Sequence, residues 1–152
     1  MNNTPRPTIK GFHHVKLAVS DLSRSLAFYE DFLSAQRIPE ADHHKEADGK
    51  LYGYIVDVPD LGTKLELRLN PEQAKKHGLF DQFTLAVKDR DALGQWVSYL
   101  DSHGITHSPV IPAIQAWLIV VEDPDRNRWR LYTLEKHGPE IKPDEDNVWL
   151  RD

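Results

Sequence analysis

The stretch that decides the fold is residues 11–33, GFHHVKLAVSDLSRSLAFYEDFL. In residues 15–19, apolar side chains alternate with polar or small ones, which is the period-2 pattern of a strand with one buried face. Asp21 ends this alternation and can cap a helix, because its carboxylate can accept a backbone N–H. Residues 22–33 then carry apolar side chains at spacings that give a helix one apolar face. We therefore predict a strand that leads directly into an amphipathic helix, with His14 at the start of the strand.

A second stretch, residues 82–104, repeats this unit as QFTLAVKDRDALGQWVSYLDSHG. Leu17, Val19 and Asp21 each have an identical residue 68 positions later. The shared L-A-V-x-D, followed in both places by a helical pattern, indicates two related halves rather than a chance match.

The repeat divides the chain into five segments. They are an N-terminal arm (residues 1–8), a first module (9–70), a linker (71–81), a second module (82–134) and a C-terminal tail (135–152). Alternating apolar residues predict the remaining strands of both modules. These strands are expected in residues 35–46, 51–58, 64–69, 105–111, 114–122 and 128–134. Each module therefore has the predicted order β-α-β-β-β.

Length and composition exclude several classes of function. A chain of 152 residues is long enough for one compact unit made of two small modules. The net charge of −5, with scattered Lys and Arg, offers no basic surface for nucleic acid. Without cysteine there is no disulfide or thiolate chemistry, and no apolar run approaches the roughly 20 residues of a membrane helix. No secretory signal is visible, so we expect a cytoplasmic protein that binds neither nucleic acid nor membranes.

Four motifs in these modules resemble the vicinal oxygen chelate superfamily, which includes glyoxalase I, bleomycin-resistance proteins, fosfomycin-resistance proteins and extradiol dioxygenases. They are H-V-x-L-x-V-x-D-L at residues 14–22, S-x-x-F-Y-x-D-x-L at 25–33, L-E-L at 65–67 and D-P-D-x-N at 123–127. The resemblance covers roughly residues 9–134. It implies an α+β fold in which two βαβββ modules form a curled mixed sheet around a shared cleft.

The resemblance also implies four equivalent positions for metal ligands, occupied here by His14, Glu66, Gln82 and Arg130. Imidazole and carboxylate groups suit Zn, Ni, Mn or Fe, and the Gln82 amide oxygen is a weaker, neutral donor. Arg130 departs from the family pattern, because a guanidinium has no lone pair to donate. At about 4 Å and an effective dielectric near 20, it would repel a dication by about twice the roughly 4 kcal/mol of a unit pair. His14, Glu66 and Gln82 are therefore the predicted metal ligands.

Other residues are candidates for catalysis or for substrate binding. The fork of Arg130 donors suits a carboxylate, phosphate or enolate group, or an ion pair with Glu66 across an empty cleft. Glu66 and His107 are the candidate catalytic residues, and the resemblance places His107 at the cleft lining. Tyr54 and Trp117 are strand aromatics that alternation allows in the cleft wall, where they would contact a flat or apolar ligand.

Two functions remain open from the sequence. The first is a divalent-metal-dependent lyase or isomerase that acts on a small oxygenated substrate. Extradiol dioxygenase chemistry is not expected, because only the His14 equivalent of its two histidines and one glutamate is present. The second is a metal-free protein, similar to the bleomycin-resistance branch, that binds a small molecule with Arg130 and the cleft aromatics. Exposed sheet edges favour a homodimer in either case, and the adjacent His43 and His44 are interpreted as solvated loop residues.

Overall fold

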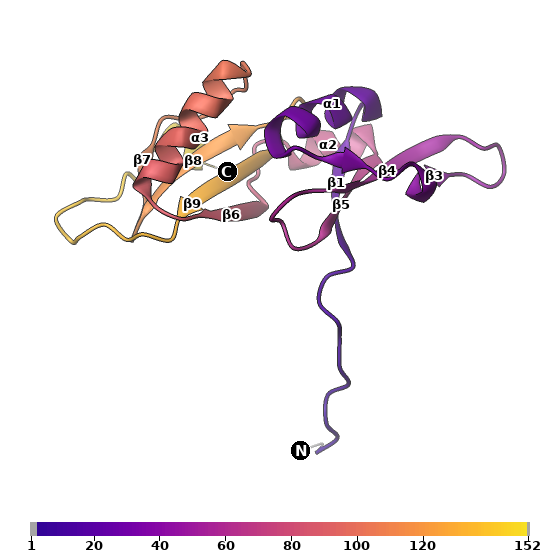
Figure 1. Ribbon diagram of the computed structural model, residues 1–152, viewed down its shortest axis with the longest axis horizontal. Helices are drawn as coiled ribbons and strands as arrows, with labels where there is room; N and C mark the ends of the chain where they lie inside the picture. Colours follow the sequence, from indigo (N-terminus) through magenta and orange to yellow (C-terminus); the bar gives the residue numbers. More distant parts are fainter. Residues whose placement is uncertain (1–2, 152) are drawn as a thin grey trace.

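The first module forms one mixed sheet with a helix on one face, as a computed structural model that describes residues 3–151 shows (Figure 1). Its elements are β1 (His14–Val19), α1 (Leu22–Leu33), β2 (Gln36–Arg37), the 3₁₀ helix η1 (Pro39–Ala41), β3 (His43–His44), β4 (Leu51–Asp57) and β5 (Lys64–Leu69). The strand order is β1-β5-β4-β2, and β3 also pairs with β4. Strands β1 and β5 run parallel, whereas the other pairs are antiparallel.

The second module repeats this arrangement after a linking helix, α2 (Pro71–His77). Its elements are β6 (Phe83–Val87), α3 (Arg90–Ser102), β7 (Ile111–Pro112), β8 (Trp117–Glu122) and β9 (Arg128–Thr133), and the 3₁₀ helix η2 (Val148–Leu150) lies in the tail. The strand order β6-β9-β8-β7, with β6 parallel to β9, matches that of the first module. The predicted α+β fold of two βαβββ modules is confirmed. None of the helices in residues 3–151 has the length and apolar character needed to cross a bilayer.

Two strands that the sequence predicted as continuous are interrupted. Residues 35–46 form only β2, η1 and β3, and residues 105–111 form a single bridge between His107 and Val121 before β7 begins. Proline explains both interruptions, because it cannot donate a hydrogen bond to a neighbouring strand. Pro39 begins η1, and Pro109 follows the bridge.

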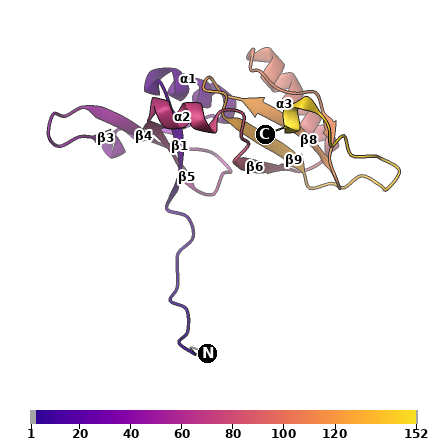
Figure 2. The same ribbon diagram turned by 180° about the vertical axis from the view of Figure 1, so that it is seen from behind.

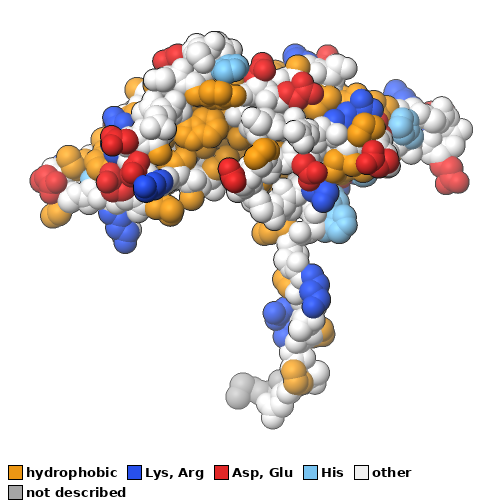
Figure 3. All heavy atoms as spheres, in the orientation of Figure 1, with side chains coloured by type: hydrophobic (Ala, Val, Ile, Leu, Met, Phe, Trp, Pro, Cys, Tyr) orange, Lys and Arg blue, Asp and Glu red, His pale blue; other side chains and the backbone are white. Residues whose placement is uncertain are grey.

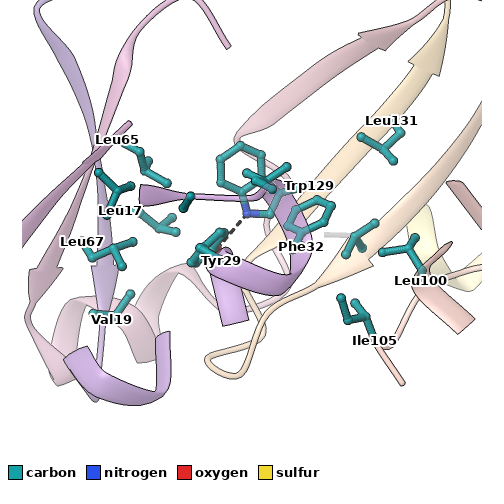
Figure 4. Packing of buried hydrophobic residues seen from close by; sticks show 14 of the residues in the cluster. Leu17, Val19, Tyr29, Phe32, Leu65, Leu67, Leu100, Ile105, Trp129 and Leu131 are labelled. Carbon is teal, nitrogen blue, oxygen red and sulfur yellow. Dashed lines mark hydrogen bonds between the residues drawn. The ribbon is translucent and has the colours of Figure 1, made fainter. Parts of the chain in front are cut away.

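One apolar core joins the two modules (Figure 4). Side chains of β1 and β5 contribute one side of it, and α1 lies between them and β9. The rings of Tyr29 and Phe32 in α1 lie 5.8 and 6.0 Å from the ring of Trp129 in β9. Phe32 also contacts Trp96 of α3 at 6.1 Å. Because burying a large apolar side chain contributes about 1.5–3 kcal/mol, these contacts fix the modules to one another.

A buried hydrogen-bond network crosses the same boundary. The Tyr29 hydroxyl donates to Asp123 Oδ2 at 2.7 Å, and Trp129 Nε1 donates to the Tyr29 oxygen at 2.9 Å. The Asn127 side-chain amide donates to the same Asp123 oxygen at 3.0 Å. Burial raises the pKa of Asp123, and burial together with the Asp123 charge raises the pKa of Tyr29 well above its ordinary value. The phenol therefore acts as a neutral donor that links the two modules.

The N-terminal residues 3–12 leave the body as an extended arm (Figures 1 and 2). All of these residues are exposed, including Ile9 at 72% and Phe12 at 78%. Large apolar side chains grouped on a protruding segment are a frequent mark of an association surface.

Replacing Tyr29 with Phe should lower the free energy of unfolding by about 1–3 kcal/mol, because Asp123 and the Trp129 indole then lose a buried partner. Urea unfolding followed by circular dichroism measures this loss. Tyr99→Phe is the matched control, since the Tyr99 hydroxyl donates to the Asp31 carbonyl at an exposed position and its removal should cost much less. An equal cost for both variants would contradict the role of the buried network.

The Tyr29 contribution also has a defined pH dependence. Its folded-state pKa lies above the ordinary value of 10.0, so the contribution of the protonated phenol is complete below pH 10.0 and is lost as pH rises through the raised pKa. In Tyr29→Phe, the free energy of unfolding should therefore decrease less than in wild type as pH rises through the raised Tyr29 pKa.

Candidate functional site

Glu66 lies at the centre of a polar cluster on the first sheet. The alternation of β5 directs Leu65 and Leu67 into the shared core, so Glu66 points to the opposite side, here called the open face of the first sheet. His14 of β1 lies on the same face, since β1 and β5 run parallel with Lys16 opposite Glu66. The Glu66 side chain is nevertheless fully buried.

Three side chains surround the Glu66 carboxylate. Arg68 Nε donates to Oε2 at 2.5 Å. The other oxygen, Oε1, lies 3.1 Å from His14 Nε2 and 3.5 Å from His43 Nε2, but it has no hydrogen-bond partner among the described residues. Both imidazoles are partly exposed, each at 29%. In Figure 3, histidine side chains lie where the arm meets the body.

Strand pairing brings His43 into this cluster. The hairpin of β3 and β4 pairs His43 with Gly53, and Gly53 pairs in turn with Arg68 of β5. A bulge between His43 and His44 shifts the register at this point. The interpretation of His43 as a solvated loop residue is therefore wrong, whereas His44 is exposed as expected.

Gln82 and Arg130 lie on the second module, on the corresponding open face of its sheet. Trp129 and Leu131 point into the shared core, so Arg130 between them points away from it. Arg130 Nε donates to Asp81 Oδ2 at 2.6 Å. Within residues 3–151, no hydrogen bond or ion pair joins Arg130 or Gln82 to Glu66 or His14. The ion pair that the sequence suggested between Glu66 and Arg130 is not formed, because Glu66 pairs with Arg68 and Arg130 pairs with Asp81 of the linker.

This duplicated arrangement, with ligand-type residues on each sheet, matches a known family. The family model described as "Glyoxalase/Bleomycin resistance protein/Dioxygenase superfamily" matches residues 11–131. The chain belongs to this superfamily.

Solved structures of low sequence identity share the superfamily fold. The fosfomycin resistance protein FosX from Listeria monocytogenes is 16% identical, with a TM-score of 0.65 over 88% of this chain and 98% of that chain. A FosX mutant complexed with Mn(II) and dihydroxypropylphosphonic acid is 15% identical, with a TM-score of 0.62 over 82% and 90%. An antibiotic binding protein from a Streptomyces species is 19% identical, with a TM-score of 0.65 over 84% and 98%.

Arg130 cannot itself ligate a metal ion, because a guanidinium has no lone pair to donate. No group of three or more His, Asp or Glu side chains in residues 3–151 is prearranged to hold a metal ion. Two of the four positions, His14 and Glu66 on the first module, carry side chains of a type that can bind a metal ion. Glu66 Oε1 is a buried anionic donor atom without a hydrogen-bond partner in the described chain, and an imidazole nitrogen lies beside it.

The other predicted site residues lie away from Glu66. His107 Nε2 contacts Asp101 of α3 at 2.6 Å. Tyr54 is 8% exposed and pairs with Leu67 on the core side of the first sheet. Trp117 packs against the shared core of the molecule. The catalytic role of His107 and the substrate contacts of Tyr54 and Trp117 stay predictions.

An apolar groove of about 860 Å³ separates the two modules on their helical side. Its lining includes Leu61 from the β4–β5 turn, Val87 of β6, and Trp96 and Tyr99 of α3. Apolar side chains gather beside the helices of both modules in Figure 3. The lining contains none of the four predicted metal-ligand positions, so the groove and the Glu66 cluster are separate features.

The C-terminal tail covers part of the open face of the second sheet. Trp149 and Leu150 pack against a small core that includes Leu118 and Val120 of β8. The Arg128 guanidinium lies 5.0 Å from the centre of the Trp149 ring and donates to the Trp149 carbonyl at 3.1 Å. Sequence reasoning left this tail unassigned, and the contact gives Arg128 a partner that its strand pattern alone does not indicate.

The His137 side chain holds the start of this tail in place through contacts with two backbone carbonyl groups. Its Nε2 lies 2.7 Å from the Ala113 carbonyl oxygen, and its Nδ1 lies 2.9 Å from that of Gly138. Because carbonyl oxygens only accept, a ring that donates to both carries two protons and a positive charge. These two bonds, the Ala113 bond first, raise the pKa of His137 above its ordinary 6.5.

We expect the tail to loosen as pH rises. A raised folded-state pKa means that the His137 contribution is complete below pH 6.5 and is lost as pH rises through the raised value. The Trp149 indole N–H resonance in ¹H–¹⁵N NMR spectra should therefore shift toward a solvent-exposed position over that range. His137→Gln should remove this pH dependence, whereas His103→Gln, at the end of α3, should leave it unchanged. A Trp149 titration that persists in His137→Gln would contradict this assignment.

Proposed function

We propose that the chain binds a small oxygenated molecule over the open face of the first sheet and acts on it as a divalent-metal-dependent lyase or isomerase. The observation that carries this proposal is the Glu66 carboxylate, which is fully buried and has one oxygen without a hydrogen-bond partner among the described residues. The contacts of this oxygen with His14 and His43 are at ion-pair distance without hydrogen-bond geometry. A carboxylate oxygen with free hydrogen-bonding capacity can accept a further partner, which supports the proposal that a ligand binds here.

Each residue of the cluster has a distinct role in this proposal. His14 and Glu66 would hold the ion, whose chemistry is to polarise two neighbouring substrate oxygens as a Lewis acid. Arg68 fixes the carboxylate through Oε2. Lys16 and Lys64 lie on the same open face, and with Arg68 they favour a substrate that carries an anionic group. The FosX structure with Mn(II) and a phosphonate supports this combination for the fold.

A second candidate function is metal-free binding of a small molecule on the second sheet. Arg130 favours it, because this side chain is 26% exposed on an open face and is held in place by Asp81. A guanidinium of this kind is suited to two-point binding of a carboxylate or phosphate. The antibiotic binding protein of the same fold supports this alternative.

We also propose that the protein is a homodimer. In one copy both open faces point away from the shared core, so a second copy would allow the first sheet of one chain to face the second sheet of the other. Strand β6 is the edge of its sheet, with Thr84 and Ala86 exposed. The arm presents Ile9 and Phe12 as further apolar contacts.

A panel of small carboxylates, diols and phosphonates, with fosfomycin among them, tests the two functions by thermal unfolding with Mn²⁺ or with EDTA. A ligand at about 100 times its Kd adds about 2.7 kcal/mol, which should raise Tm by roughly 5–10 °C. The metal-dependent proposal expects this shift only with Mn²⁺, and expects Glu66→Ala to abolish it. Glu46→Ala, at an exposed position, is the matched control.

The metal-free candidate gives the opposite result. The shift would then persist in EDTA and in Glu66→Ala, and Arg130→Ala would abolish it. A panel in which no compound gives a metal-dependent shift would overturn the lyase or isomerase proposal.

Light scattering coupled to size-exclusion chromatography tests the dimer. The expected mass is twice the 17.5 kDa of one chain. Replacing both Ile9 and Phe12 with Ser should increase the monomer fraction, because the double variant removes the exposed apolar contacts of the arm. Lys10→Ser changes the same arm without removing apolar surface and should leave the dimer intact. A monomeric wild-type protein would contradict the proposal.

A further inference from the structure

We infer that Arg68 binds an oxyanion group of the substrate, a carboxylate or a phosphonate, through the two terminal nitrogens of its guanidinium. The inference rests on the proposed function in placing the substrate over the open face of the first sheet. It goes further by naming the chemical group that this face recognises and the side chain that binds it. It does not depend on whether a metal ion is bound.

The Arg68 guanidinium is held in place by two neighbouring side chains. Its Nε donates to Glu66 Oε2 at 2.5 Å, and the Glu66 side chain is only 1% exposed. The Arg68 Cζ atom lies 5.0 Å from the centre of the Tyr52 ring, so the guanidinium lies over the face of that ring. An arginine that is fixed in advance loses less side-chain entropy when it binds a ligand.

The two terminal nitrogens, Nη1 and Nη2, are the part of Arg68 that is left for a ligand. Among residues 3–151, neither nitrogen has a hydrogen-bond or ion-pair partner. The Arg68 side chain is 30% exposed, so a ligand in solution meets the guanidinium before it meets the buried carboxylate. Two nitrogens of one guanidinium match two oxygens of a carboxylate or phosphonate, and such charge-assisted pairs are stronger than neutral hydrogen bonds.

Arg37 of β2 shows what an occupied guanidinium looks like in the same sheet. It also lies over a ring, with its Cζ atom 4.6 Å from the centre of Tyr54. Asp42, however, accepts hydrogen bonds from both Nε and Nη2 of Arg37, which is a closed two-point pair. Glu66 accepts only from Nε of Arg68. Arg68 therefore keeps the donors that Arg37 has already used on a carboxylate.

The neighbouring strands leave room beside Arg68. Its partners in the sheet are Ala18 of β1 and Gly53 of β4, which have the smallest side chains. A Cβ atom at Gly53 would lie 3.4 Å from His43 Cβ, so a larger residue there would crowd this space. Lys16, two positions before Ala18 on the same open face, is exposed and adds positive charge. A small anion can therefore approach the guanidinium from the open face.

NMR titration of the ¹⁵N-labelled full-length protein with methylphosphonate, and separately with propionate, tests the inference in the presence of EDTA. In wild type, the Gly53 amide and the Arg68 Nε–H resonances should shift and reach saturation. Arg68→Lys keeps the positive charge but removes the pair of terminal nitrogens, so binding should weaken by at least about 10-fold. Arg37→Lys is the matched control and should bind as wild type does, because Asp42 already occupies that guanidinium.

A second variant tests the site without removing the arginine. Tyr52→Leu keeps the pair between Arg68 and Glu66 but removes the ring that supports the guanidinium, so binding should weaken by about 2–5-fold. Circular dichroism of each variant shows whether the fold is retained. If Arg68→Lys does not fold, the wild-type resonances and Tyr52→Leu still decide the question.

The possible results separate this inference from the proposed function. Saturable shifts of Gly53 and Arg68 with either probe support the inference, and the tighter probe identifies the group. No saturable shift, shifts centred on Thr84 and Arg130, or unchanged binding in Arg68→Lys would overturn it. If oxyanions bind at Arg68 but no compound gives a Mn²⁺-dependent thermal shift, only the metal-dependent function is wrong. If diols give that shift while Arg68→Lys binds oxyanions as wild type does, only the role of Arg68 is wrong.

Discussion

The Asp123 carboxylate is the constraint on which the relative position of the two modules depends. It lies in the turn between β8 and β9, and its Oδ1 accepts the backbone N–H groups of Asp125 at 2.9 Å and Asn127 at 2.8 Å. Its Oδ2 accepts the Tyr29 hydroxyl, which comes from the first module. A buried carboxylate is costly unless donors surround it, and here the donors come from both modules. The turn and α1 are therefore stabilised together, and Trp129 is fixed above Tyr29. This packing sets both open faces away from the core.

Much of the fold follows from local pattern. Helix α1 begins and ends where the apolar spacing after Asp21 predicts, and the Asp21 carboxylate accepts the Arg24 N–H as a helix cap. The parallel pairs β1–β5 and β6–β9 agree with the repeat. Pattern alone did not reveal where strands would break, because apolar alternation continues through Pro39 and Pro109 although neither residue has an N–H to donate. The relative placement of the modules was also beyond local pattern, since it depends on contacts about 100 residues apart, such as Trp129 with Tyr29.

The candidate site, like the fold, could be predicted from the sequence only in part. His14 and Glu66 lie on adjacent parallel strands at positions that point to one face, so the repeat and the family resemblance were enough to bring them together. His43 was missed because its position depends on a hairpin register with a bulge. A signal was present, since a turn at Asp48–Gly49 sets β3 against β4 and brings His43 opposite Gly53. Arg130 was linked to Glu66 on the assumption of one shared cleft. In the structure, Arg130 donates to Asp81 instead, and Glu66 pairs with Arg68.

The duplicated modules have acquired opposite chemistry at equivalent places. On the open face of the first sheet, the buried Glu66 carboxylate lies between two imidazoles and the Arg68 guanidinium. The open face of the second sheet presents Arg128 and Arg130, and the tail covers part of it with the Trp149 ring. A guanidinium over an aromatic ring and an apolar floor favours anionic or flat groups rather than a metal. One scaffold thus carries a buried carboxylate at one open face and guanidinium groups at the equivalent place on the other.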